Sequence, residues 1–149
     1  AVALDTGWPM DGWTEANRAA VTKWLSRSTL ALFNEIETTT LAGRSDPVKA
    51  ARKLQAGMKR GATVVVKRGP HGALAIGPDE ALASAEAPRV EVVDTIGAGD
   101  VFNAAFLAAL AREEPLAACL AAGTGIASRA ISTRPRFYGS PLPFEETTA

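Results

Sequence analysis

The 149-residue sequence has little cysteine and histidine, and it has no surplus of charge of one sign. A single cysteine cannot form a disulfide within the chain, and one cysteine with one histidine argues against a Cys/His zinc site. The 16 basic residues equal the 16 acidic residues, which leaves no basic excess for nucleic acid. No apolar run reaches transmembrane length, and no signal peptide is visible. We therefore expect a cytoplasmic protein that binds neither nucleic acid nor membranes.

The sequence does contain 47% apolar and 21% charged residues, a balance typical of a globular domain. Its length corresponds to one domain with a substantial core. Cys119 lies in an alanine-rich run and is expected to be a small buried residue. The chain opens directly on a strand pattern at residues 2–4, without an initiator methionine. We therefore expect it to be the C-terminal part of a longer protein.

Strand and helix patterns alternate along the chain. The predicted strands are residues 2–4, 30–33, 63–67, 73–76, about 81–85 and 90–93. The predicted helices are residues 14–26, a short one from 35, 46–61, 98–112 and 115–130. Residues 77–80 are expected to turn a hairpin. This alternation predicts an α/β sheet with helices on both faces.

Polar residues gather where the predicted strands end. Asp5 ends the first strand and Asn34 ends the second, while residues 67–72 and 94–100 follow two others. Ligands of α/β sheets bind beyond the carboxyl ends of the strands. The sequence therefore predicts one binding site at this edge of the sheet.

The most informative segment is a turn of small residues before the predicted helix at 98. Gly97, Ala98 and Gly99 leave backbone N–H groups bare at a helix N-terminus, where the helix dipole also favours an anion. Asp100 adds a carboxylate that could accept the proton of an attacking hydroxyl, an arrangement that suits phosphoryl transfer. The alternative is an ordinary strand-to-helix turn, with Asp100 as a favourable first-turn residue.

Asn34 and Glu37 form an Asn-x-x-Glu pattern after a predicted strand. An amide and a carboxylate at that place could hold Mg²⁺ through water, near the phosphates of a nucleotide. The alternative is a helix capping box, in which Asn34 caps the helix and Glu37 completes the box. The pattern alone favours the capping box.

Residues 67–72 join two predicted strands. Gly69 and Gly72 would let the backbone approach a nucleotide closely, and Lys67 could reach a phosphate as a point charge. A plain tight turn, with Lys67 as a solvated strand end, is the alternative. His71 is expected to be an exposed turn residue.

One run of residues resembles the C-terminal signature of the ribokinase-like (PfkB) carbohydrate kinases: Asp94-Thr95-x-Gly97-Ala98-Gly99-Asp100, followed by Phe102 and Asn103. The resemblance extends from residue 5 to about residue 134, in the family's motif order. It implies an α/β/α sandwich of three layers, with a mostly parallel doubly wound sheet and a short antiparallel hairpin at one edge. It also implies that residues 1–149 are the ATP-binding, catalytic-base part of one sugar-kinase domain, whose N-terminal half and lid are absent.

The resemblance implies ATP-dependent phosphorylation of a hydroxyl group of a sugar or sugar derivative. It makes Asp100 the general base and the N–H groups of residues 97–100 the anion hole. It favours Mg²⁺ over the capping box as the role of Glu37, with the ion bound through water. The residues that it implies for nucleotide binding are Asn34, Glu37, Lys67, Gly69, Gly72 and Thr95.

The resemblance assigns Asp94 to a monovalent cation such as K⁺, which orders the loop in relatives. Here Arg136 and Phe137-Tyr138 stand where relatives usually carry a Gly-Ala pair, a departure that leaves the cation open. Thr6 likewise replaces the usual proline after Asp5.

Two other functions stay open besides the sugar kinase. One is a catalytically silent nucleotide-binding or assembly module on the same fold, and the other is a vitamin kinase of the wider superfamily. No P-loop motif is present. We expect the 149 residues alone to be inactive, with an incomplete sheet edge prone to association. The sequence leaves a homodimer open.

Overall fold

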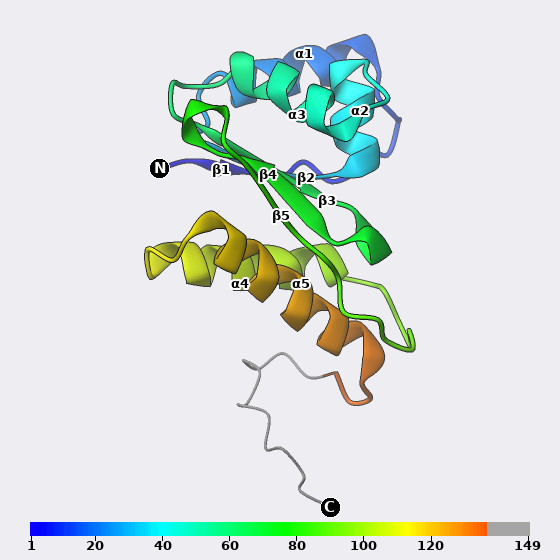
Figure 1. Cartoon of the computed structure of the whole chain (residues 1–149). Helices are drawn as coiled ribbons and strands as arrows, with labels where there is room; N and C mark the ends of the chain where they lie inside the picture. Colours follow the sequence, from blue (N-terminus) through cyan, green and yellow to red (C-terminus); the bar gives the residue numbers. More distant parts are fainter. Residues whose placement is uncertain (137–149) are drawn as a thin grey trace, which may run out of the picture.

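The computed structural model describes residues 1–136, which form three layers. Figure 1 shows one group of helices above a central sheet and a second group below it. The first group is α1 (Glu15–Leu25), α2 (Glu35–Ala42) and α3 (Pro47–Ala56), and the second is α4 (Ala98–Ala111) and α5 (Leu116–Ser132). The predicted α/β/α sandwich is confirmed.

The central sheet has five strands in the order β1-β2-β3-β4-β5. They are β1 (Ala3–Leu4), β2 (Leu30–Asn34), β3 (Thr63–Lys67), β4 (Ala73–Ile76) and β5 (Leu82–Ala85). The first three strands are parallel, whereas β4 and β5 form the predicted antiparallel hairpin at one edge. The carboxyl ends of β1, β2 and β3 therefore lie at one edge of the sheet.

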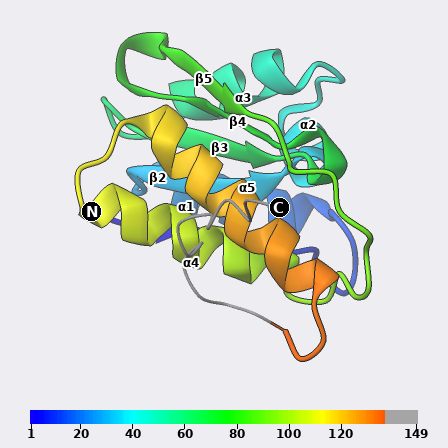
Figure 2. The ribbon, with the colours of Figure 1, turned by 60° about the horizontal axis from the view of Figure 1, so that its bottom comes forward.

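Alternation along the buried strands builds a separate core on each face of the sheet. In β3, Val64 and Val66 pack with residues of α1, α2 and α3, whereas Val65 faces Phe106 of α4. Both faces are covered, so the strand is apolar throughout. Figure 2 shows α4 and α5 on the second face, where they also pack against each other. Cys119 is fully buried there, as predicted.

The prediction of a strand at residues 90–93 is wrong. This segment crosses from the hairpin to α4, and the side chains of Val92 and Val93 are exposed. The backbone N–H groups of Val93 and Asp94 donate to the carbonyl oxygen of Ile131, near the end of α5, at 2.8 and 3.1 Å. A helix end thus satisfies the backbone that a neighbouring strand would otherwise have satisfied, and α4 is entered from a loop.

Helix α3 ends earlier than predicted. It stops at Ala56 with Gly57 as its C-cap, whereas the sequence pattern placed the end at Gly61. Met58 therefore lies beyond the helix, although it still packs against the first core. No helix in the described residues is long and apolar enough to cross a membrane.

Candidate active site

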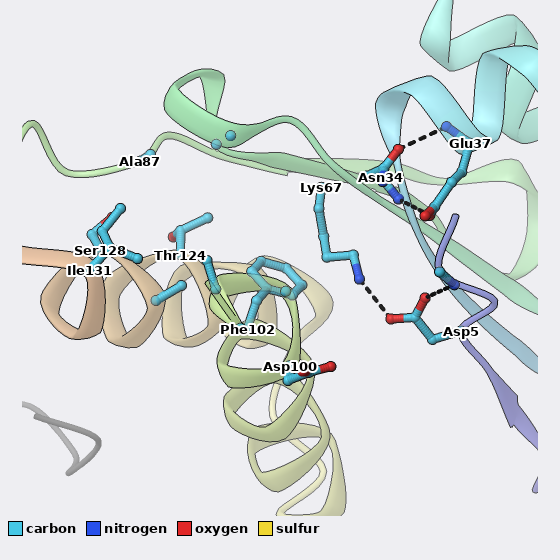
Figure 3. A pocket seen from close by; sticks show the side chains of 17 residues that line it. Asp5, Asn34, Glu37, Lys67, Ala87, Asp100, Phe102, Thr124, Ser128 and Ile131 are labelled. Carbon is cyan, nitrogen blue, oxygen red and sulfur yellow. Dashed lines mark hydrogen bonds and ion pairs between the residues drawn. The ribbon is translucent and has the colours of Figure 1, made fainter. Parts of the chain in front are cut away.

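A cleft of about 440 Å³ lies between the strand ends and the second helical layer (Figure 3). Of the eleven residues predicted for the site, nine line it: Asn34, Glu37, Lys67, Gly69, Gly72, Gly97, Ala98, Gly99 and Asp100. Thr95 and Asp94 are not among the lining residues. The sheet edge that the polar residues indicated is thus where the structure places a cleft.

The first turn of α4 lines this cleft, and most of its backbone donors find no partner in the described part of the chain. Gly97 begins the turn with a φ of 72°, a left-handed conformation that favours glycine. The N–H of Ala98 donates to the carbonyl oxygen of Thr95 at 3.1 Å. Within the described residues, the N–H groups of Gly97, Gly99 and Asp100 have no acceptor. Three donors and the exposed Asp100 carboxylate therefore share one turn.

The first turn of α2 is closed by its own side chains. Asn34 Oδ1 accepts the N–H of Glu37 at 2.7 Å, and Glu37 Oε2 accepts the N–H of Asn34 at 2.8 Å. The capping box, which was the alternative to the role toward Mg²⁺, is present. Burial raises the pKa of Glu37, the hydrogen bond from Asn34 opposes this, and the charge of Asp5 adds to the rise. Because Glu37 also lines the cleft, its capping role is compatible with the predicted role toward Mg²⁺, which stays a prediction.

Lys67 is paired with two residues from distant parts of the chain. Its Nζ donates to Asp5 Oδ2 at 2.8 Å and to Asn103 Oδ1 at 3.1 Å. Its side chain is only 14% exposed, so the alternative of a solvated strand end is wrong. Burial alone would raise the pKa of Asp5, but the hydrogen bond and charge of Lys67, with Asn103, hold it below its usual value.

The two glycines of the β3–β4 turn meet different constraints. Gly72 has a φ of 78°, and a side chain there would collide with the carbonyl oxygen of Ala85 on β5. Gly69 also has a positive φ, but open space surrounds it. Packing against the hairpin therefore requires glycine at position 72 whether or not a nucleotide binds. His71 is exposed, as predicted.

The sequence analysis placed Asp5 at the predicted edge of the sheet without giving it a role, and it did not include Asn103 or the α5 wall among the site residues. Thr124 and Ser128 of α5 line the cleft opposite Lys67 (Figure 3). Both are buried polar residues in an alanine-rich helix, and their spacing of four places them on one face. Asn103 likewise follows Gly99 by four residues. This helical spacing was the signal that could have identified them.

Asp94 lies in the loop before α4, outside the lining of the cleft. Its Oδ1 accepts the N–H of Ile96 at 2.9 Å, and its Oδ2 forms an ion pair with Arg136. The N–H of Ile96 and the Arg136 guanidinium lower the pKa of Asp94. Arg136 also donates to the carbonyl oxygens of Asp94 and Ile96. Phe137 and Tyr138, where the sequence differs from the Gly-Ala pair usual in relatives, lie outside the described residues. The monovalent cation predicted at Asp94 stays a prediction.

The charges of the cleft bear on what can bind there. Among residues 1–136, its lining includes three carboxylates, Asp5, Glu37 and Asp100, and one basic side chain, Lys67. Among the described residues, no group of three or more His, Cys, Asp or Glu side chains could hold a metal ion. A divalent cation would therefore need ligands from water or from a bound anion.

Comparison with known proteins finds similarity to carbohydrate kinases. The family model described as pfkB family carbohydrate kinase matches residues 4–135. Ketohexokinase of Mus musculus is 39% identical over 88 residues, which are 58% of this chain and 30% of that protein. The 1-phosphofructokinase of Haloferax volcanii is 45% identical over 95 residues, 62% of this chain and 29% of that protein. This chain thus spans about 30% of the length of these relatives.

A solved structure extends the similarity to three dimensions. It is an E. coli protein described as a ribokinase II, in complex with ATP and Mg²⁺. It superposes with a TM-score of 0.71 at 26% identity, over 80% of this chain and 38% of its own. The likeness therefore extends to the three-dimensional arrangement of most of this chain.

Proposed function

Because the chain belongs to the pfkB family of carbohydrate kinases, we propose that it carries the ATP-binding and catalytic-base part of a kinase. The enzyme would transfer a phosphoryl group from ATP to a hydroxyl of a sugar or sugar derivative. The observation that carries this proposal is the first turn of α4, where three N–H groups to which residues 1–136 offer no acceptor share one cleft with the Asp100 carboxylate.

The amides of Gly97, Gly99 and Asp100 are the proposed anion hole. They would donate to the transferring phosphoryl group as it moves, with support from the positive end of the α4 dipole. The N–H of Ala98 is already bonded to Thr95, and that bond holds the turn in shape. This refines the predicted set of four donors to three.

Asp100 is the proposed general base. It lies next to the amides, so an acceptor hydroxyl that approaches the phosphoryl group would also meet its carboxylate. Asp100 would take the hydroxyl proton as the new oxygen–phosphorus bond forms, and ADP would leave with the electrons of the broken bond.

The charge of the cleft supports ATP with Mg²⁺ as cofactor. A nucleotide triphosphate beside three carboxylates and one lysine requires added positive charge. Glu37 and Asn34 would hold Mg²⁺ through water, because the described residues offer no complete metal site of their own. When bound, Mg²⁺ neutralises phosphate charge. Gly69 and Gly72 would line the nucleotide on one side, opposite the α5 wall.

The test is sugar-dependent ADP release by the full-length protein with ATP and Mg²⁺ against a panel of sugars, sugar phosphates and vitamin alcohols. We expect turnover on a sugar or a sugar phosphate, and an Asp100→Asn variant reduced by about 10²- to 10⁴-fold with ATP binding unchanged. Asp79→Asn is the matched control, because Asp79 is exposed, lies outside the cleft and has a positive φ that asparagine accepts.

Other outcomes would direct the assignment elsewhere. Binding of ATP without turnover on any acceptor would favour the silent module, and turnover on a vitamin alone would favour the vitamin kinase. Turnover that is indifferent to Asp100 would remove the proposed base. The 149 residues alone are expected to release no ADP in this assay.

A further inference from the structure

Three side chains from three separate elements form a closed hydrogen-bonded triangle at the cleft. Lys67, at the end of β3, donates to Asp5 after β1 and to Asn103 on α4. Asn103 Nδ2 also donates to the oxygen of Asp5 that Lys67 contacts. The partners are separated by 62, 36 and 98 residues along the chain. The triangle therefore connects the ends of two strands to a helix of the opposite layer.

The triangle meets α4 at the turn that carries the proposed chemistry. Asn103 lies four residues after Gly99, so the two share one face of the helix. A Cβ atom on Gly99 would lie 3.5 Å from Lys67 Nζ, which shows that the amine rests against this turn. Asp100 directly follows Gly99. A change in the position of Lys67 would therefore move the base and the free amides together.

The charge of Lys67 is already used within the protein. Its side chain is 14% exposed, and that of Asp5 is 30% exposed, so the ion pair is partly dehydrated. If Lys67 left Asp5 for a phosphate, the described lining of the cleft would offer Asp5, Glu37 and Asp100 no other basic side chain. Separating a partly buried pair leaves an uncompensated charge, which is unfavourable. The contacts thus favour a fixed amine over a mobile phosphate ligand.

We propose that Lys67, held by Asp5 and Asn103, is a positioning residue that sets the first turn of α4 against the ends of β1 and β3. This inference rests on the phosphoryl-transfer function proposed above. It replaces the prediction that Lys67 contacts a phosphate, and it adds Asp5 and Asn103 to the residues on which the reaction depends. The effect of the triangle is on the geometry of Asp100 and its neighbouring amides, and therefore on kcat more than on ATP affinity.

The experiment is a double-mutant cycle in the full-length protein, with Lys67→Met, Asp5→Asn and the double variant. It measures kcat, the KM for ATP, the Kd for ATP by calorimetry, and thermal unfolding. Each single variant is expected to lower kcat by about 10- to 100-fold while the Kd for ATP changes by less than about threefold. The kcat of the double variant is expected to be no lower than that of the slower single variant. Each single change already disrupts the triangle, so the second change removes nothing further. Lys49→Met, at an exposed lysine outside the cleft, is the matched control.

Asn103→Ala keeps the Asp5–Lys67 pair and removes only the link to α4, so it serves if a charge variant fails to fold. It should lower kcat and leave the Kd for ATP unchanged. A raised Kd for ATP in Lys67→Met, with Asp5→Asn like wild type, would overturn the proposal in favour of a phosphate ligand. Additive losses in kcat, or variants indistinguishable from Lys49→Met, would also overturn it. Wild-type protein without sugar-dependent ADP release would instead refute the proposed function itself.

Discussion

Two helix N-termini face the same cleft and are built in opposite ways. In α2, the side chains of Asn34 and Glu37 occupy two of the backbone N–H groups. In α4, Gly97 provides no side chain, and the described residues offer no acceptor to the N–H groups of Gly99 and Asp100. A closed N-terminus has fewer donors left for a ligand, whereas an open one is available to an anion. The contrast supports the proposal that an anion binds at α4, while α2 presents the Glu37 carboxylate to the cleft.

The difference originates at a single position in each helix. Asn34 has an extended backbone, with φ of −81° and ψ of 168°, from which its side chain accepts the N–H of the third helical residue, Glu37. Gly97 has φ of 72° and ψ of 7°, a conformation that glycine adopts at little cost. The residue at the N-cap thus decides whether a helix start is used by the protein or left for a ligand.

Straining the first turn of α4 is expected to have the largest effect on this difference between the two helix N-termini. Gly97→Ala would place a Cβ on a left-handed residue, at a cost of about 1–2 kcal/mol in the free energy of unfolding. The accompanying shift of the amides is expected to lower kcat by about 100-fold, since small misplacements at a reacting centre have effects of that size. Urea unfolding and steady-state kinetics measure the two effects.

Gly97→Asn is the matched control, because asparagine tolerates the left-handed conformation better than alanine does. It should lose less stability and less activity than Gly97→Ala. Full activity in Gly97→Ala, together with the expected loss of stability, would show that the open amides of α4 do not serve the reaction.

A smaller effect is expected at the closed turn, where capping and charge can be separated. Glu37→Gln retains an oxygen that can accept the N–H of Asn34, so stability at neutral pH should not fall. The Mg²⁺ concentration needed for half-maximal activity should rise by about tenfold. Asn34→Ala is the counterpart, and it should lower the free energy of unfolding by about 1 kcal/mol through loss of the cap. An unchanged Mg²⁺ requirement in Glu37→Gln would leave Glu37 with its capping role alone.

The pH dependence of the free energy of unfolding is a second measurement that distinguishes Glu37→Gln from wild type. The folded-state pKa of Glu37 lies above its ordinary value of 4.5, so the folded protein binds this proton more tightly than the unfolded chain does. The stability that this provides is fully present below pH 4.5 and is lost as the pH rises through the folded pKa. Urea unfolding at several pH values should therefore show wild type losing stability relative to Glu37→Gln as the pH rises.

The smallest effect is expected in the loop that leads into the open turn. The Arg136 guanidinium already pairs with Asp94 and donates to the carbonyl oxygen of Ile96. Replacing K⁺ by a bulky organic cation should therefore change wild-type kcat by less than about twofold, because a fixed cation holds the loop. Arg136→Ala should make activity depend on K⁺. Strong K⁺ dependence in wild type would support the cation predicted at Asp94.

Local sequence predicted much of the fold and part of the cleft. The open turn of α4 and the β4–β5 hairpin depend on residues a few positions apart, and both were predicted. The α2 cap is equally local, and the sequence pattern alone favoured it as the alternative to a role toward Mg²⁺. The prediction of a strand at residues 90–93 was wrong because a β-branched segment forms a strand only where a neighbouring strand is available to pair with it. Its backbone bonds to Ile131, a choice made by the packing of α5.

The sequence by itself determined which helix start is closed and which is open, because N-cap chemistry acts between residues at most four positions apart. It also placed Asp100 in the open turn. Only the tertiary structure decided that Lys67 lies against that turn in contact with Asp5 and Asn103. The strand ends indicated that Asp5 and Lys67 share one edge of the sheet. The contacts of Lys67 with side chains 36 and 62 residues away are fixed by the packing of the sheet against the α4 layer.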